Sequence, residues 1–162
     1  MDLLNILQSL EETSIALAIK EGDNLFPWLE SFHVLAITLV VGTIAIVDLR
    51  LIGYPSHRRG ARQLIVELLP FTWVAFVVAV ITGSLLFLSN AVKYFENPLF
   101  LIKMGLLLAA GINMAIFHLG AYRKITEWDD LLPPPVSVRV AGAMSLCLWI
   151  GVVIFGRWIG FS

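Results

Sequence analysis

The stretch SFHVLAITLVVGTIAIV, residues 31–47, contains no Asp, Glu, Lys or Arg, and three further stretches, 68–92, 104–122 and 140–156, share this property. About 20 apolar residues at a rise of 1.5 Å cross a hydrocarbon core that is ~30 Å thick, and in lipid only a helix satisfies its backbone groups within one segment. We therefore predict an all-α, integral membrane four-helix bundle. Its spans are expected near residues 28–52, 66–90, 98–122 and 136–160.

The composition of the chain agrees with this fold class. Of the 162 residues, 59% are hydrophobic and 14% are charged, with a mean hydropathy of +0.88, whereas a soluble domain is about 45–50% apolar and about 25% charged. The net charge of −1 provides no basic field for phosphates, which excludes a nucleic-acid partner. The single cysteine, Cys147, excludes an intramolecular disulfide. We expect membrane lipid to be the main surface partner.

Residues 1–22 differ from the rest of the chain. Five leucines recur there at near-helical spacing, with charged residues between them. This pattern is typical of an amphipathic helix that lies on a membrane surface. Function is therefore expected from the four-helix transmembrane domain, residues 23–162.

The basic residues predict the orientation of the bundle. An even number of spans puts both termini on one side of the membrane. Most basic residues lie on the opposite side, which the loops after the first and third spans reach: Arg50, Arg58, Arg59, Arg62, Arg123, Lys124 and Arg139. The positive-inside rule then makes the loop side cytoplasmic and both termini extracytoplasmic.

Two histidines lie within the predicted spans, where a polar side chain is costly and asks for a partner or a function. His33 lies near the outer end of the first span, and His118 lies near the inner end of the third. An imidazole in hydrocarbon is a common haem or metal ligand. The simpler interpretation is a buried histidine that is hydrogen-bonded to a neighbouring hydroxyl or carbonyl group.

The helical positions around His118 favour a cofactor. Gly111 precedes it by seven residues and lies about 20° away on the helix, with Met104 and Met114 within about 40°. A glycine below a histidine makes room for a flat macrocycle, although it also permits close helix packing. His33 and His118 are separated by roughly 25 Å along the membrane normal, so they cannot share one metal. We expect either two sites or a single site at one histidine.

The candidates for a second iron ligand differ between the two ends of the predicted bundle. Near the inner face, His57 or Met144 is a possible partner for His118. Near the outer face, Lys103 or Met104 is the available neighbour of His33. The iron could also stay five-coordinate there, or two copies of His33 could meet across a dimer axis.

The remaining polar residues of the spans have two interpretations. Asp48, Arg50, Lys103 and Arg157 lie near span ends, where boundary residues snorkel or pair. Arginines at these edges, Arg157 outside and Arg50 or Arg123 inside, are also placed to bind haem propionates. Asn113, below the middle of the third span, is a further candidate for a cofactor contact.

Short motifs distributed over nearly the whole chain resemble an uncharacterised family of small bacterial four-helix membrane proteins, described as a domain of unknown function. The resemblance implies a multi-pass protein of the bacterial inner membrane. The motifs are Phe32-His33-Val34-Leu35, Val47-Asp48-Leu49-Arg50, Trp73, Thr82-Gly83, Asn97-Pro98, Lys103, Asn113 and Phe117-His118.

The layout is also similar, more distantly, to the membrane protoporphyrinogen oxidase family HemJ, whose members bind haem b. That family has a histidine early in the first helix, an arginine at the end of that helix, and a lysine followed by a histidine in one later helix. The residues at matching places here are His33, Arg50, Lys103 and His118. The copper-resistance CopD family is similar in having a histidine that opens a membrane helix. These resemblances imply a haem-b or metal-linked redox role.

Together, these features favour a transmembrane b-type cytochrome that holds one or two haem b groups through His33 and His118 and exchanges electrons with a redox partner or quinone. A porphyrinogen or quinone oxidoreductase, with Lys103 handling protons, is the first alternative. A non-redox copper or solute module is the second. Many small residues along the spans also favour a homo-oligomer.

Overall fold

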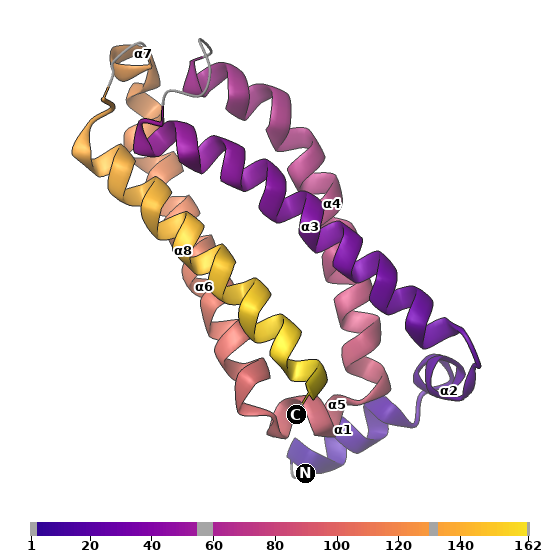
Figure 1. Ribbon diagram of the computed structural model, residues 1–162. Helices are drawn as coiled ribbons and strands as arrows, with labels where there is room; N and C mark the ends of the chain where they lie inside the picture. Colours follow the sequence, from indigo (N-terminus) through magenta and orange to yellow (C-terminus); the bar gives the residue numbers. More distant parts are fainter. Residues whose placement is uncertain (1–2, 55–59, 130–132, 162) are drawn as a thin grey trace.

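The computed structural model describes residues 3–54, 60–129 and 133–161, and within these ranges every regular element is a helix (Figure 1). Four helices are long and apolar enough to cross a membrane: α3 (Leu25–Ile52), α4 (Ala61–Ser89), α6 (Pro98–Leu119) and α8 (Val136–Trp158). By length and composition the chain is thus a membrane protein, and the predicted all-α class is confirmed. The short elements are α1 (Leu3–Glu11), α2 (Ser14–Glu21), α5 (Ala91–Glu96), η1 (Ala121–Lys124), α7 (Ile125–Trp128) and η2 (Ile159–Phe161).

Local sequence explains where these helices begin and end. The Asn97 side chain accepts a hydrogen bond from the Leu99 amide at 2.9 Å, and Pro98 occupies the first turn of α6. This arrangement satisfies a free amide at the helix start. Gly53 ends α3 with φ of 98°, a left-handed conformation that favours glycine.

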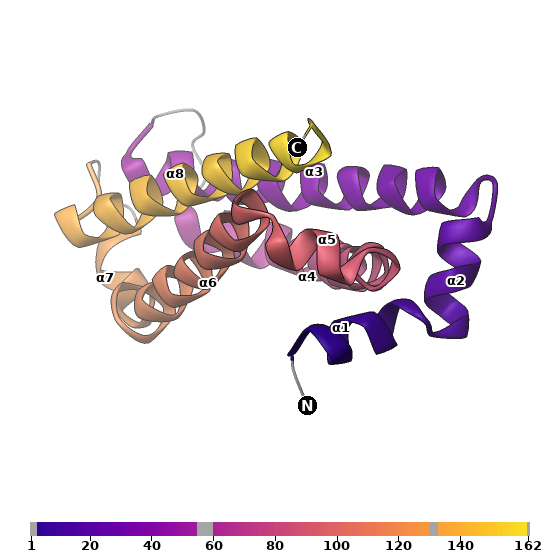
Figure 2. The ribbon, with the colours of Figure 1, turned by 90° about the horizontal axis from the view of Figure 1, so that it is seen from below.

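The long helices form two pairs, α3 with α4 and α6 with α8, which are joined mainly through α3 and α8. Figure 2 shows α3 and α8 on one side of the molecule and α4 and α6 on the other. In the described parts of α4 and α6, the two backbones hardly approach each other. We call the end that carries both termini and α5 the terminal end, and the end that carries η1 and α7 the loop end (Figure 1).

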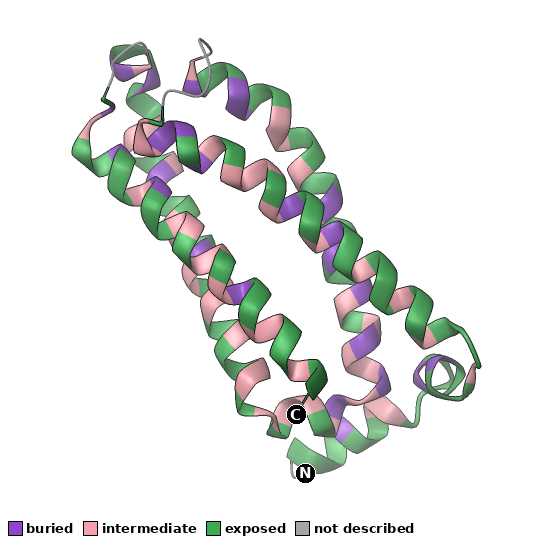
Figure 3. Cartoon of the chain, in the orientation of Figure 1, coloured by how far each residue is buried: buried purple, intermediate pink, exposed green. Residues whose placement is uncertain are grey.

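A cluster of buried apolar residues lies at the loop end. It holds together residues of all four long helices and α7, and Trp128 donates its indole N–H to the Ala121 carbonyl at 2.9 Å. The cluster comprises Leu51, Ala61, Ile65, Phe117, Ile125, Trp128 and Val138. Exposed positions run along the whole length of the long helices (Figure 3). Large apolar side chains occupy many of them, as expected for helices that face lipid.

The predicted surface helix over residues 1–22 is two short helices in the described part, α1 and α2, which turn against each other at the terminal end (Figure 2). The Thr13 side chain accepts from the Ala16 amide at 3.4 Å and caps α2, which explains why the helix restarts there. The Glu11 carboxylate accepts a hydrogen bond from the Val92 amide at 2.9 Å. This bond ties α1 to the first turn of α5.

Candidate functional site

His33 points from α3 onto α4, where the hydroxyl of Thr82 lies 3.0 Å from its Nδ1. Thr82 already donates its single hydroxyl proton to the Val78 carbonyl at 2.7 Å. While this bond holds, the Thr82 oxygen accepts from the imidazole, and the proton of a neutral ring then lies on Nδ1. The Nε2 lone pair of His33 is then available for a ligand.

Gly83 provides the space for this imidazole. A Cβ added at Gly83 would lie only 2.8 Å from Cε1 of His33, so the ring lies directly on the α4 backbone. A side chain at position 83 would displace it. The Thr82-Gly83 pair thus supplies both the acceptor and the room for His33.

Lys103 approaches the same region from the other helix pair. Its ammonium group interacts electrostatically with the His33 imidazole. A Cβ added at Gly156 of α8 would lie 3.6 Å from Nζ of Lys103, so this side chain also passes over a glycine. We call His33, Thr82, Gly83, Lys103 and Gly156 the His33–Lys103 site. All four long helices contribute to it.

Aromatic side chains cover the terminal end beside this site. The rings of Phe87 and Phe100 are stacked with centroids 5.5 Å apart, and Tyr94 of α5 lies 5.5 Å from Phe100. Burial, and then the nearby Glu30 carboxylate, raise the pKa of the Tyr94 phenol. The phenol therefore stays neutral at physiological pH. The rings of Phe87, Tyr94 and Phe100 thus form an uncharged layer at the terminal end.

His118 has a different setting. Its Nδ1 lies 2.9 Å from the Met114 carbonyl of its own helix, and since a carbonyl only accepts, Nδ1 carries the proton. The ring lies 5.1 Å from that of Tyr122. A Cβ at Gly111 would meet nothing within 4 Å, and Met114 is 42% exposed. This face of α6 therefore points away from the described parts of the other helices.

The other predicted site residues do not gather around either histidine. Arg50 is buried and donates to the Asp129 carbonyl at 2.8 Å, and Asn113 donates to the Ala141 carbonyl at 3.0 Å. The Arg157 guanidinium lies at the terminal end, 4.8 Å from the centroid of the Phe161 ring. Met144 is 50% exposed on α8.

His57, the other proposed second ligand, lies outside the described residues. Over residues 3–54, 60–129 and 133–161, no three His, Cys, Asp or Glu side chains are grouped as a metal site would require. Among these residues, no such group of three therefore includes His33.

Thr82 and Gly156 were not predicted as site residues. Thr82 follows His33 by 49 residues, and nothing in an apolar span indicates which hydroxyl meets which ring. A usable signal existed in the Thr82-Gly83 dipeptide, because a hydroxyl next to a glycine in a membrane helix marks a place where another helix can approach closely.

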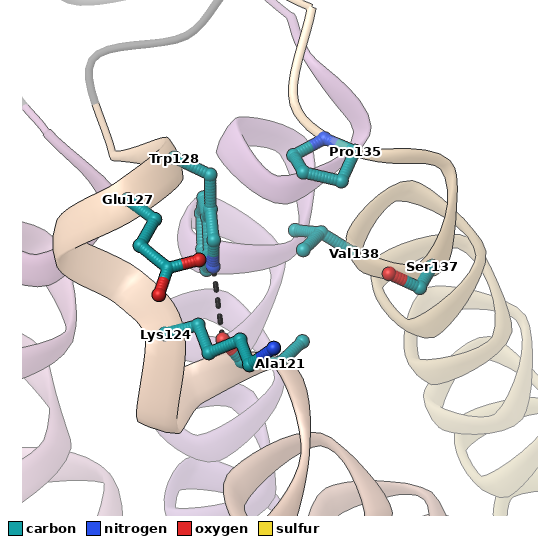
Figure 4. A pocket seen from close by; sticks show the side chains of 7 residues that line it. All are labelled: Ala121, Lys124, Glu127, Trp128, Pro135, Ser137 and Val138. Carbon is teal, nitrogen blue, oxygen red and sulfur yellow. Dashed lines mark hydrogen bonds between the residues drawn. The ribbon is translucent and has the colours of Figure 1, made fainter.

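A cavity of about 300 Å³ lies at the loop end, and neither His33 nor His118 lines it. Figure 4 shows Trp128 forming one wall, with its indole bonded to the Ala121 carbonyl, and Lys124 and Glu127 at the side. Pro135, Ser137 and Val138 line the α8 side. None of the residues predicted from sequence to bind a cofactor lines this cavity.

Comparison with known proteins gives a family but no activity. The sequence matches a family of unknown function, DUF6644, over residues 15–162. No curated protein and no solved structure matches the chain, so its resemblance to HemJ and CopD stays a prediction. The match includes all four long helices, and the chain accordingly belongs to the family of unknown function DUF6644.

Proposed function

We propose that this chain is a b-type cytochrome that holds one haem b at the terminal end of the bundle, with His33 as an axial ligand. The observation that carries this proposal is the hydrogen bond between Nδ1 of His33 and Thr82. With the Thr82 hydroxyl donating to the Val78 carbonyl, the proton of a neutral ring lies on Nδ1 and Nε2 keeps its lone pair. Histidines that bind iron or zinc usually donate their other ring N–H to such an acceptor, which orients the ring.

The surroundings of His33 fit a haem in two further respects. Glycines lie under both His33 and Lys103, so neither helix presents a bulky side chain at these points. Lys103, and Arg157 near the same end, supply positive charge that can pair with haem propionates. The Lys103 amine can alternatively serve as the second axial ligand. A bound haem would supply one-electron chemistry, while the chain holds the ligand and limits access of water.

A second haem at His118 has weaker support. The free Nε2 of His118 suits a ligand, but Gly111 and Met114 beside it face open space, so only lipid or a second copy of the chain would cover the group. We therefore propose one haem for each chain. The proposal keeps the bacterial inner membrane as its location, with the terminal end extracytoplasmic, a quinone or protein as the redox partner, and a homo-oligomer as the assembly.

The test is an absorption spectrum of the detergent-purified protein, from cells supplied with a haem precursor, before and after dithionite. We expect sharp Soret and α bands on reduction and one haem per chain by pyridine haemochrome. His33→Ala should lose the haem, whereas the matched variant His118→Ala should keep it. A colourless wild-type protein, or a His33→Ala protein that retains its haem, contradicts the proposal.

One observation favours a second candidate, a haem-dependent porphyrinogen or quinone oxidoreductase. Lys103 is a partly buried amine that acts on the His33 ring electrostatically, which suits a group that moves protons beside a cofactor. Lys103→Met should then abolish oxidation of protoporphyrinogen or quinol while the haem spectrum is retained. A fully active Lys103→Met protein would exclude this role for the amine.

A further inference from the structure

Asp48 is a carboxyl group buried inside the helical bundle near the loop end, at the opposite end from the His33–Lys103 site. Only 4% of the residue is exposed, and its Oδ2 has no hydrogen-bond partner. The Ser145 hydroxyl of α8 donates toward the same carboxyl group. The backbone is also close to α8 here, because a Cβ at Gly142 would lie 3.0 Å from the Asp48 carbonyl oxygen. Asp48 is therefore sealed between α3 and α8.

The charged and titratable side chains of the surrounding elements face elsewhere. Arg50, two residues along α3, reaches the Asp129 carbonyl instead. Arg139 of α8 and Glu67 of α4 are exposed, and His118 of α6 donates to its own helix. In the part of the chain that the structure describes, no ion pair joins Asp48 to a base.

Asn113 brings a third polar side chain to the same level of α8. Its amide donates to the Ala141 carbonyl, which points along the helix toward residue 145. The amide of Asn113 therefore lies within about one turn of Ser145 along α8, and the Ser145 hydroxyl donates toward Asp48. Residues of α3, α6 and α8 thus form one polar layer, which we call the Asp48 layer, within otherwise apolar helices.

We propose that Asp48 is a proton-binding site of this membrane protein. An ionised carboxylate without a base or a full set of donors is strongly disfavoured in a low-dielectric interior, so the group is stabilised by taking up a proton. The neutral acid has one O–H to donate and oxygens that accept, and it fits beside the Ser145 hydroxyl. Because Asp48 lies one turn from the last residue of α3, Ile52, the proton exchanges with water at the loop end. This proposal does not depend on a bound haem.

Infrared difference spectroscopy of the full chain in lipid tests the proposal. The wild-type minus Asp48→Asn spectrum at neutral pH should contain the C=O band of a protonated carboxyl group. Asp23→Asn is the matched control, because Asp23 is exposed and should contribute only ionised carboxylate bands. Ser145→Ala should shift the frequency of the Asp48 band, since that variant removes its hydrogen-bond donor.

Two results would overturn the proposal. One is the absence of a protonated C=O band that is lost in Asp48→Asn. The other is a band that disappears in sodium chloride but persists in choline chloride at the same pH, which would identify a cation site instead. If Asp48→Asn does not fold, two other measurements test the proposal: the pH titration of the C=O band in the wild-type protein, and the shift of that band in Ser145→Ala.

Discussion

At the scale of single residues, the two membrane histidines show how one side chain acquires different chemistry from its surroundings. His33 and His118 each make a hydrogen bond through Nδ1. His33 meets a hydroxyl on a neighbouring helix, whereas His118 meets a carbonyl of its own helix. Only His33 is therefore held by tertiary structure, and its orientation depends on how α3 and α4 pack.

Removing the acceptor of His33 should show this dependence. Thr82→Val keeps the shape of the side chain but leaves the imidazole N–H without its partner. We expect a loss of about 1–2 kcal/mol of stability and about 10–100-fold weaker haem binding if His33 is the ligand. Thr38→Val is the control, because the exposed Thr38 hydroxyl bonds only the Val34 carbonyl of its own helix. Thermal unfolding and haem titration of both variants measure these effects. Equal losses in Thr82→Val and Thr38→Val would contradict the expectation.

A methyl group at either of two glycines provides a second residue-scale prediction. Gly83→Ala should displace the His33 ring and lower both stability and haem content, because the new Cβ would lie 2.8 Å from Cε1. Gly111→Ala has open space and should be tolerated. Haem content and melting temperature of the two purified variants check this. If Gly111→Ala loses haem while Gly83→Ala keeps it, His118 is the ligand instead.

At the scale of elements, the joint between the two helix pairs is the contact of α3 with α8. Gly142 permits this contact, since a Cβ there would lie 2.9 Å from Cβ of Leu51. Gly142→Ala should separate the helices and destabilise the fold by about 1–3 kcal/mol, the usual cost of an overpacked contact. Gly105→Ala, with nothing within 4 Å, is the control. Unfolding in mixed micelles measures both, and an unchanged Gly142→Ala protein would mean that this joint is not required.

The spans were predictable from sequence, whereas their pairing was not. Absence of charge locates the four long helices, and Asn97-Pro98 marks the start of one of them. Apolar residues occupy every face of α3 and α4, so the hydrophobic pattern of these helices does not indicate which face meets a neighbour. The partners of His33 and Asp48 lie on other helices and depend on that packing. The leucine spacing in residues 1–22 also does not indicate the break before α2, where the Thr13 side chain caps the new helix.

At the scale of the whole molecule, the distribution of basic residues predicts that the terminal end is extracytoplasmic. Single cysteines can report it in a Cys147→Ser background. Asp23→Cys lies exposed toward the terminal end and Arg62→Cys lies exposed at the loop end. A membrane-impermeant maleimide added to intact cells should label Asp23→Cys. Arg62→Cys should stay unlabelled until the membrane is permeabilised. The reverse pattern would invert the orientation and put the His33–Lys103 site on the cytoplasmic side.

The two-pair arrangement also bears on how the molecule is made. Synthesis proceeds from the N-terminus, and His33 and Thr82 both belong to the first pair, α3 with α4. The histidine can thus find its hydroxyl acceptor before Lys103 has left the ribosome. Lys103 and Gly156 arrive with the second pair, and docking of α8 on α3 brings them into place. The ring is fixed early by a partner within the first pair, and the site is completed late when the second pair docks. Errors in the second pair would therefore leave a correctly held histidine that remains uncovered.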